Sequence, residues 1–224
     1  MHTASCLSLI AAAALTLSLL CDAAHARNAA AEPALSTQFQ TNQRKAILSG
    51  HADKLRDAML GLYRLNPHEL RKSASVSAKE MVQWVFEGPF GWKFEGLRNA
   101  QGTDALHLAF APEFGGDRVL ALITGIQTMM IAAYGGKTEF HFPAAADPMQ
   151  LAITAHNLNL VLSRLGPEPP PSHEVQLGMI VADADILSTL SAIGNSLKQD
   201  AERLTGGTPV NPPASAGDTE FVPL

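Results

Sequence analysis

The sequence predicts a mainly helical domain in which four or five helices surround one buried helix, with a small antiparallel β-hairpin at one side. Two observations favour this class. Apolar residues recur at steps of three and four along several long segments, which is the spacing of one helix face. Residues 119–134 are apolar nearly all round, which is typical of a helix at the centre of a domain. An α+β fold is the alternative.

The first helix is expected over residues 43–65, where Asn66-Pro67 ends it and starts a short turn, with Asn66 as the cap. A second helix is expected after Ser77, because Ser77 and Glu80 form a capping box in front of an apolar run. The first helix carries one apolar stripe, which consists of Ile47, Leu48, His51, Leu55, Ala58, Met59, Leu62 and Tyr63.

The hairpin is expected where the period of the pattern changes from about 3.6 to two. Residues 99–102 resemble a turn, and they separate two short runs in which apolar residues alternate with others. These alternating residues are Phe90, Trp92 and Phe94 before the turn, and Leu106, Leu108 and Phe110 after it.

The central helix is expected over residues 119–134, with Asp117 as its cap and Gly135-Gly136 as its stop. Gly125 inside this helix indicates a close helix crossing, because glycine costs about 1 kcal/mol relative to alanine in a helix. Gln127 in the same helix is expected to bind a neighbouring helix, because a buried amide needs hydrogen-bond partners, and a place in the lining of a cavity is the alternative.

Two further helices are expected near the other end of the sequence. Asp147-Pro148 starts one that runs to about Leu165, and a brief strand at Phe140 and Phe142 precedes it. The last helix is expected from about Asp183 to Leu204, after a proline-rich connector. Its inward face is expected to consist of Ile186, Leu187, Leu190, Ile193, Leu197, Ala201 and Leu204.

The start of the chain resembles an export signal. An apolar core over residues 7–20 is followed by Ala24-His25-Ala26, a small-x-small cleavage site. The expected organisation is therefore a signal peptide at 1–26, a flexible leader at 27–40, a domain at 41–204 and a disordered tail at 205–224. The expected location is therefore periplasmic or secreted. The alternative is a periplasmic protein attached to the membrane by a lipid anchor at Cys21.

Charge and cysteine usage exclude several classes of function. The net charge is −5 and no basic run is present, which argues against a nucleic-acid partner. The only cysteines are Cys6 and Cys21, so a chain cleaved after residue 26 has no disulfide, thiol nucleophile or thiolate metal ligand. We expect no cofactor, and no transmembrane helix in the mature chain.

No established catalytic motif is present, and we expect no catalytic residue. The expected function is that of a non-catalytic cell-envelope protein that binds or scaffolds a protein partner or an apolar ligand. The aromatic run Phe90, Trp92 and Phe94 is by default expected to be part of the core. If part of it is exposed, it is the candidate interaction surface for an envelope protein or an apolar small molecule. A metal-dependent or other hydrolase is the alternative, and its candidate residues are Glu139, His141, Asp147 and His156. Next to His156, Asn157 and Asn159 indicate a polar contact, either with a ligand or with the backbone of a loop.

Residues 114–165 resemble a group of uncharacterised exported proteins of proteobacteria. The resemblance is carried by the segments Phe114-Gly115-Gly116-Asp117-Arg118-Val119 and Ala133-Tyr134-Gly135-Gly136-Lys137, by Glu139-Phe140, and by Ala155-His156-Asn157-Leu158. It implies an exported protein, in some cases lipid-anchored, and it assigns no activity to any residue.

Overall fold

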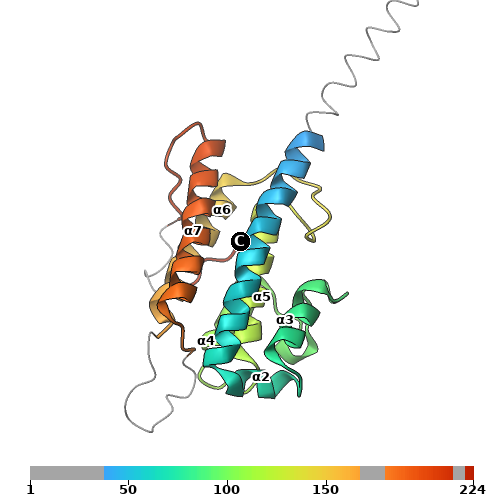
Figure 1. Cartoon of the computed structure of the whole chain (residues 1–224). Coiled ribbons are helices and arrows are strands. Elements are labelled where there is room, and N and C mark those ends of the chain that lie inside the picture. Colours follow the sequence, from blue (N-terminus) through green and yellow to red (C-terminus); the bar gives the residue numbers. More distant parts are fainter. Residues whose placement is uncertain (1–37, 167–179, 214–219) are drawn as a thin grey trace, which may run out of the picture. The chain divides into compact units, whose positions relative to one another are not determined.

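The computed structural model describes residues 38–166, 180–213 and 220–224 (Figure 1). The chain divides into two compact units, residues 1–44 and residues 45–224. All contacts discussed below lie within the second unit. The signal peptide, the Cys21 anchor and the proline-rich connector fall outside the described residues.

The described part of the chain is mainly helical, which confirms the predicted class. A first helix covers residues 38–65. It is followed by α2 (Pro67–Ser73), α3 (Ala78–Glu87), the short 3-10 helix η1 (Glu95–Leu97), α4 (Gly102–Phe110), α5 (Arg118–Ala133), α6 (Pro148–Arg164) and α7 (Ala184–Leu204). Over these residues the only β-type pairs are two isolated bridges, Thr138 with His141 and Gly166 with Val181.

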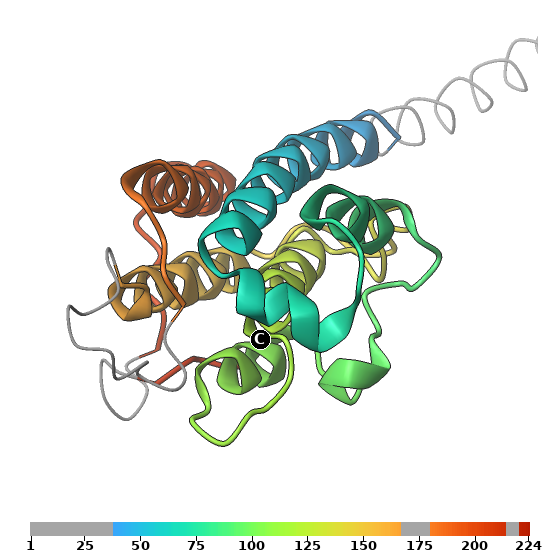
Figure 2. The same ribbon diagram turned by 60° about the horizontal axis from the view of Figure 1, so that its bottom comes forward.

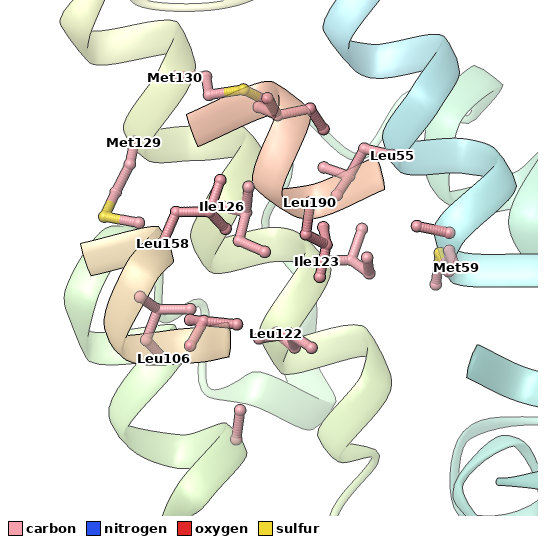
Figure 3. Packing of buried hydrophobic residues seen from close by; sticks show 14 of the residues in the cluster. Leu55, Met59, Leu106, Leu122, Ile123, Ile126, Met129, Met130, Leu158 and Leu190 are labelled. Atoms are coloured by element: carbon pink, nitrogen blue, oxygen red, sulfur yellow. The ribbon is translucent and has the colours of Figure 1, made fainter. Parts of the chain in front are cut away.

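Helix α5 is the centre of the fold, as its apolar pattern predicts. Ile123 and Met129 are fully buried and Ile131 is 5% exposed. Helices α4 and α6 pack against α5, and α7 packs against α6 (Figures 1 and 2). Figure 3 shows the labelled side chains of α5 meeting others from the surrounding helices: Leu55, Met59, Leu106, Leu158 and Leu190.

Three predicted helix caps are confirmed. The Ser77 side chain accepts from the Glu80 N–H, and the Glu80 carboxylate accepts from the Ser77 N–H in return. Asp117 caps α5 by accepting from the Leu120 N–H, and Asp147 caps α6. Gly135 follows α5 with a φ of 79°, the left-handed conformation that glycine adopts without strain.

Gly125 marks the predicted close crossing, between α4 and α5. A Cβ atom at this position would lie 2.6 Å from Leu106 Cδ2 and 2.9 Å from the carbonyl oxygen of Gly102. The crossing therefore requires a residue without a side chain.

The predicted β-hairpin is wrong. Its second strand, with Leu106, Leu108 and Phe110, is helix α4, which buries Ala105, Leu106 and Ala109 at helical spacing. The small alanines face the core, so a pattern that counts only large apolar residues assigns the wrong period. The first strand is interrupted because Trp92 has a φ of 61°.

Three smaller predictions also fail. The Phe140 and Phe142 strand is replaced by the single Thr138–His141 bridge, and Phe140 is 78% exposed. Leu204 is 54% exposed at the last residue of α7, where the helix extends past the core. Asn66 precedes α2 but makes no side-chain cap, because its amide is used elsewhere.

Within the described residues, no helix is both long enough and apolar enough to span a bilayer.

Candidate functional site

The residues proposed for a metal site do not gather in the structure. Asp147 caps α6, His141 is exposed on the loop before it, and His156 is half-buried in the middle of α6. Glu139 has one carboxylate oxygen, Oε2, that is buried without a hydrogen-bond partner. Among residues 38–166, 180–213 and 220–224, no group of three or more His, Cys, Asp or Glu side chains is placed to hold a metal ion.

The three aromatic residues proposed as an interaction surface have different environments. Trp92 is buried, and its ring meets the edges of Phe86 at 5.2 Å and Phe94 at 6.4 Å between centroids. Phe90 stays 45% exposed and Trp84 is 51% exposed. Trp84 and Phe90 border a shallow depression beside α3. The pattern of the sequence does not single out Trp84, because it occupies the outer face of an amphipathic helix.

One buried polar cluster joins the first helix to the start of α5. The Tyr63 hydroxyl donates to Asp117 Oδ2 at 2.7 Å, and Glu69 accepts from the Arg118 N–H at 2.7 Å. Burial raises the pKa of Asp117, and hydrogen bonds from the Leu120 N–H and the Tyr63 hydroxyl oppose that rise. These contacts connect the first helix, α2 and the start of α5.

A second buried cluster joins the first helix, α5 and α7. The Tyr134 hydroxyl donates to Asp200 Oδ2 at 2.6 Å and lies 3.4 Å from His51 Nε2. Asp200 also pairs with Arg203. Burial is the main cause that lowers the pKa of His51, with Lys54 adding to it and Asp200 opposing it. The group resembles a catalytic triad in composition, but His51 and Asp200 are 4% and 6% exposed. We therefore interpret it as structural.

The polar contact predicted around Asn157 is made with backbone. Asn157 Nδ2 donates to the Val222 carbonyl at 2.7 Å, and Asn157 Oδ1 accepts from the Val222 N–H at 2.8 Å. Phe221 and Val222 are buried, although they lie in the range 205–224 where a disordered tail is expected. Gln127 is 1% exposed. Within the described residues its Oε1 atom accepts no hydrogen bond, so the expected bond with another helix is not observed at this atom.

A pocket of about 450 Å³ lies between the start of α4 and the end of α5. This volume is in the range of small-molecule sites in proteins. Its walls come from four segments that are distant in sequence. They are Gly91 and Trp92; Gln101, Gly102, Thr103 and Asp104; Thr128, Ile131, Ala132, Gly136, Lys137 and Thr138; and Pro223 and Leu224.

Hydrogen bonds fix the walls of this pocket to one another. The Gln101 side-chain amide donates to the carbonyl oxygens of Gly91 and Trp92, at 3.3 and 3.2 Å. The Gly102 N–H donates to Thr128 Oγ1 at 2.7 Å, and the Thr128 hydroxyl donates to the Thr124 carbonyl. The turn before α4, the first turn of α4 and α5 are thus held in one arrangement.

The Gly91-Trp92 wall has a strained backbone. Gly91 and Trp92 have φ values of 55° and 61°, both in the left-handed region. A bulky residue in this region costs on the order of 1–3 kcal/mol, and such strain is concentrated at binding and active sites. The packing of Trp92 between Phe86 and Phe94 maintains the conformation.

The chemistry of the lining is mixed. Trp92, Ile131 and Ala132 offer apolar surface, while Lys137 supplies a cation and Asp104 a carboxylate. Threonine hydroxyls add neutral hydrogen-bonding groups. The described lining residues include no histidine and no cysteine. The arrangement is suited to holding a small molecule that has both an apolar and a polar part.

Sequence reasoning identified Trp92 but not the rest of the pocket. Three glycines are the signal around it: Gly91 lies in a turn, Gly102 begins α4 and Gly136 follows the end of α5. Comparisons with protein-family models, curated proteins and solved structures found no match to this chain.

Proposed function

We propose that this chain is an exported, non-catalytic binding protein of the cell envelope, and that the pocket between α4 and α5 holds its small-molecule ligand. The observation that carries the proposal is the strained Trp92 backbone in the wall of a preformed pocket. Strain of this kind is concentrated at binding and active sites, and its place in the pocket wall supports a ligand site there.

The ligand class follows from the lining. The apolar surface of Trp92, Ile131 and Ala132 suits an apolar body, and Lys137 suits an anionic end. Export is supported by the apolar core at 7–20 and the small-x-small site that ends at Ala26. The intact mass of the protein from its native host tests location, since cleavage after Ala26 and acylation of Cys21 leave chains of different mass.

Trp92 itself reports on occupancy. The chain has 2 tryptophans, so Trp84→Phe leaves Trp92 as the single indole, in the wall of the pocket. We expect anilinonaphthalene sulfonate, an aromatic dye with one sulfonate, to quench Trp92 fluorescence with saturation. Ala132→Phe adds a phenyl ring to the pocket wall, which obstructs the site and should abolish this quenching. Ala192→Phe on the exposed side of α7 is the matched control and should leave it unchanged.

A neutral dye distinguishes the role of the apolar walls from the role of the Lys137 charge. Lys137→Ala should weaken binding of the sulfonate dye about tenfold, which corresponds to about 1.4 kcal/mol of binding free energy. N-phenylnaphthylamine, which has no charge, should bind this variant as tightly as it binds the unmodified protein. Equal quenching in the Ala132→Phe and Ala192→Phe proteins, both folded by circular dichroism, would refute the pocket as the site.

A further inference from the structure

Residues 220–224 pack against side chains of α4 and α6, and the surface that they cover is called the α4–α6 groove below. The Phe221 side chain is 5% exposed. Its ring lies 5.4 Å from the His107 ring and 6.0 Å from the Phe110 ring, and the Arg164 guanidinium carbon lies 4.2 Å from its centroid. Two helices thus form an aromatic and cationic pocket for one side chain.

Beside this pocket, the groove binds backbone. Asn157 on α6 is fully buried, and its amide makes two hydrogen bonds to Val222, one to the carbonyl and one to the N–H. A neighbouring β-strand would satisfy the same two groups in the same way. The Asn157 side chain therefore recognises the backbone of residue 222, and these two hydrogen bonds do not depend on which side chain that residue carries.

All the groups that recognise the segment belong to α4 and α6, and both helices are parts of the core around α5. The segment contributes one aromatic side chain, one extended backbone unit and an aliphatic side chain, that of Val222. Nothing in these contacts requires the segment to belong to the same chain. The docked residues themselves define the chemistry of the peptide that the groove accepts.

We infer that the groove formed by His107, Phe110, Asn157 and Arg164 is a binding site for an extended peptide of a partner protein, with an aromatic residue followed by an aliphatic one. Residues 220–224 occupy this site in the free protein and compete with the partner. Competition from an attached segment lowers the apparent affinity for an added peptide in proportion to the fraction of molecules in which the groove is free.

The test uses the complete protein and the peptide acetyl-Glu-Phe-Val-Pro-Leu, labelled with a fluorophore. Phe221→Ala weakens the attached competitor, so the peptide should bind this variant at least about tenfold more tightly than it binds the unmodified protein. The peptide acetyl-Glu-Ala-Val-Pro-Leu should show no binding to either. Equal or undetectable binding of the first peptide to both proteins would overturn the inference.

Asn157 provides the specific variant. In the Phe221→Ala background, Asn157→Ala should abolish binding of the peptide, because both backbone hydrogen bonds are lost. Asn159→Ala changes an exposed asparagine of the same helix and should leave binding unchanged. Loss of affinity in both variants to the same extent would contradict recognition by Asn157.

A measurement on the unmodified protein covers the case in which Phe221→Ala does not fold. Saturating peptide should speed hydrogen exchange of the Val222 N–H at least about fivefold, because a displaced segment loses its bond to Asn157. Unchanged exchange at saturation would overturn the inference. So would a dimer that forms in the unmodified protein and is lost in Phe221→Ala, because a second copy would then be the occupant. Pro223 and Leu224 of the same segment also line the α4–α5 pocket. The peptide readouts follow Phe221, Val222 and Asn157 and not the dye, so peptide binding can be absent while dye quenching at Trp92 is intact, and the reverse. The failure of this inference and that of the proposed function are therefore distinguishable.

Discussion

The Asn66 side chain binds both backbone polar groups of Val181, 115 positions away: Nδ2 donates to the Val181 carbonyl at 2.8 Å, and Oδ1 accepts from the Val181 N–H at 2.9 Å. Asn157 holds Val222 in the same way. Both asparagines are fully buried. Two separate parts of the chain are thus attached to the helical core by an amide that takes the place of a neighbouring strand.

Asn66→Ala should lower the free energy of unfolding by about 1–3 kcal/mol, because the Val181 N–H and carbonyl lose their partner in a largely buried setting. Urea denaturation measures the change. Asn195→Ala replaces an exposed asparagine on α7 and should change stability by less than about 0.5 kcal/mol. A loss of the same size in both variants would show that the Val181 contact contributes little.

Gly125→Ala and Gly194→Ala should have opposite effects on stability. In a helix, alanine is favoured over glycine by about 1 kcal/mol. At Gly194 the new methyl would lie 3.5 Å from Leu158 Cδ2, an ordinary contact, so the substitution should stabilise. At Gly125 the methyl would lie 2.6 Å from Leu106 Cδ2 and 2.9 Å from the Gly102 carbonyl oxygen, so separating α4 from α5 should cost about 1–3 kcal/mol.

Thermal unfolding of the two glycine variants, followed by circular dichroism, provides the comparison. The midpoint should fall for Gly125→Ala and rise for Gly194→Ala. A rise for both would mean that α4 moves away from α5 without cost, and the close crossing would then be unimportant for the fold.

The buried His51 should make the protein less stable at mildly acidic pH. Burial lowers the pKa of His51 in the folded state, so below its ordinary value of about 6.5 the unfolded chain binds a proton that the folded chain does not. The free energy of unfolding therefore falls as pH drops below about 6.5, by up to about 1.4 kcal/mol per pH unit, until the folded-state pKa is reached.

His51→Phe removes the titrating group and keeps an aromatic ring against Tyr134. Urea denaturation at pH 7.5 and pH 5 should show a smaller loss of stability on acidification in this variant than in the unmodified protein. Parallel losses in the two proteins would mean that His51 is protonated to the same extent in the folded and unfolded states.

The long helices could be predicted from the sequence, because each repeats its apolar spacing over several turns, and α5 and α6 also begin at a recognisable cap. Asp117 and Asp147 illustrate this, since each accepts from N–H groups in the first turn of its helix. Short segments contain too few turns for the apolar spacing to repeat. Over 106–110, the alternation of larger and smaller apolar residues fits a strand as well as a helix, and packing against Gly125 decides in favour of α4.

The candidate sites could be predicted only in part. The contact of Asn157 with backbone was among the expected alternatives, but its partner was not, because Val222 lies next to a run rich in glycine, proline and serine. The α4–α5 pocket combines four distant segments, and its position depends on the left-handed backbone at Trp92. The sequence pattern does not predict the left-handed conformation of Trp92, because most bulky residues do not adopt it.

The central claim is that the α4–α5 pocket holds a small molecule in the native protein, and native mass spectrometry of protein purified from its own host tests this most directly. The unmodified chain and the Ala192→Phe control should carry the same noncovalently bound small molecule, and the Ala132→Phe protein should lack it. Identical spectra for all three folded proteins, with or without an added mass, would contradict the claim.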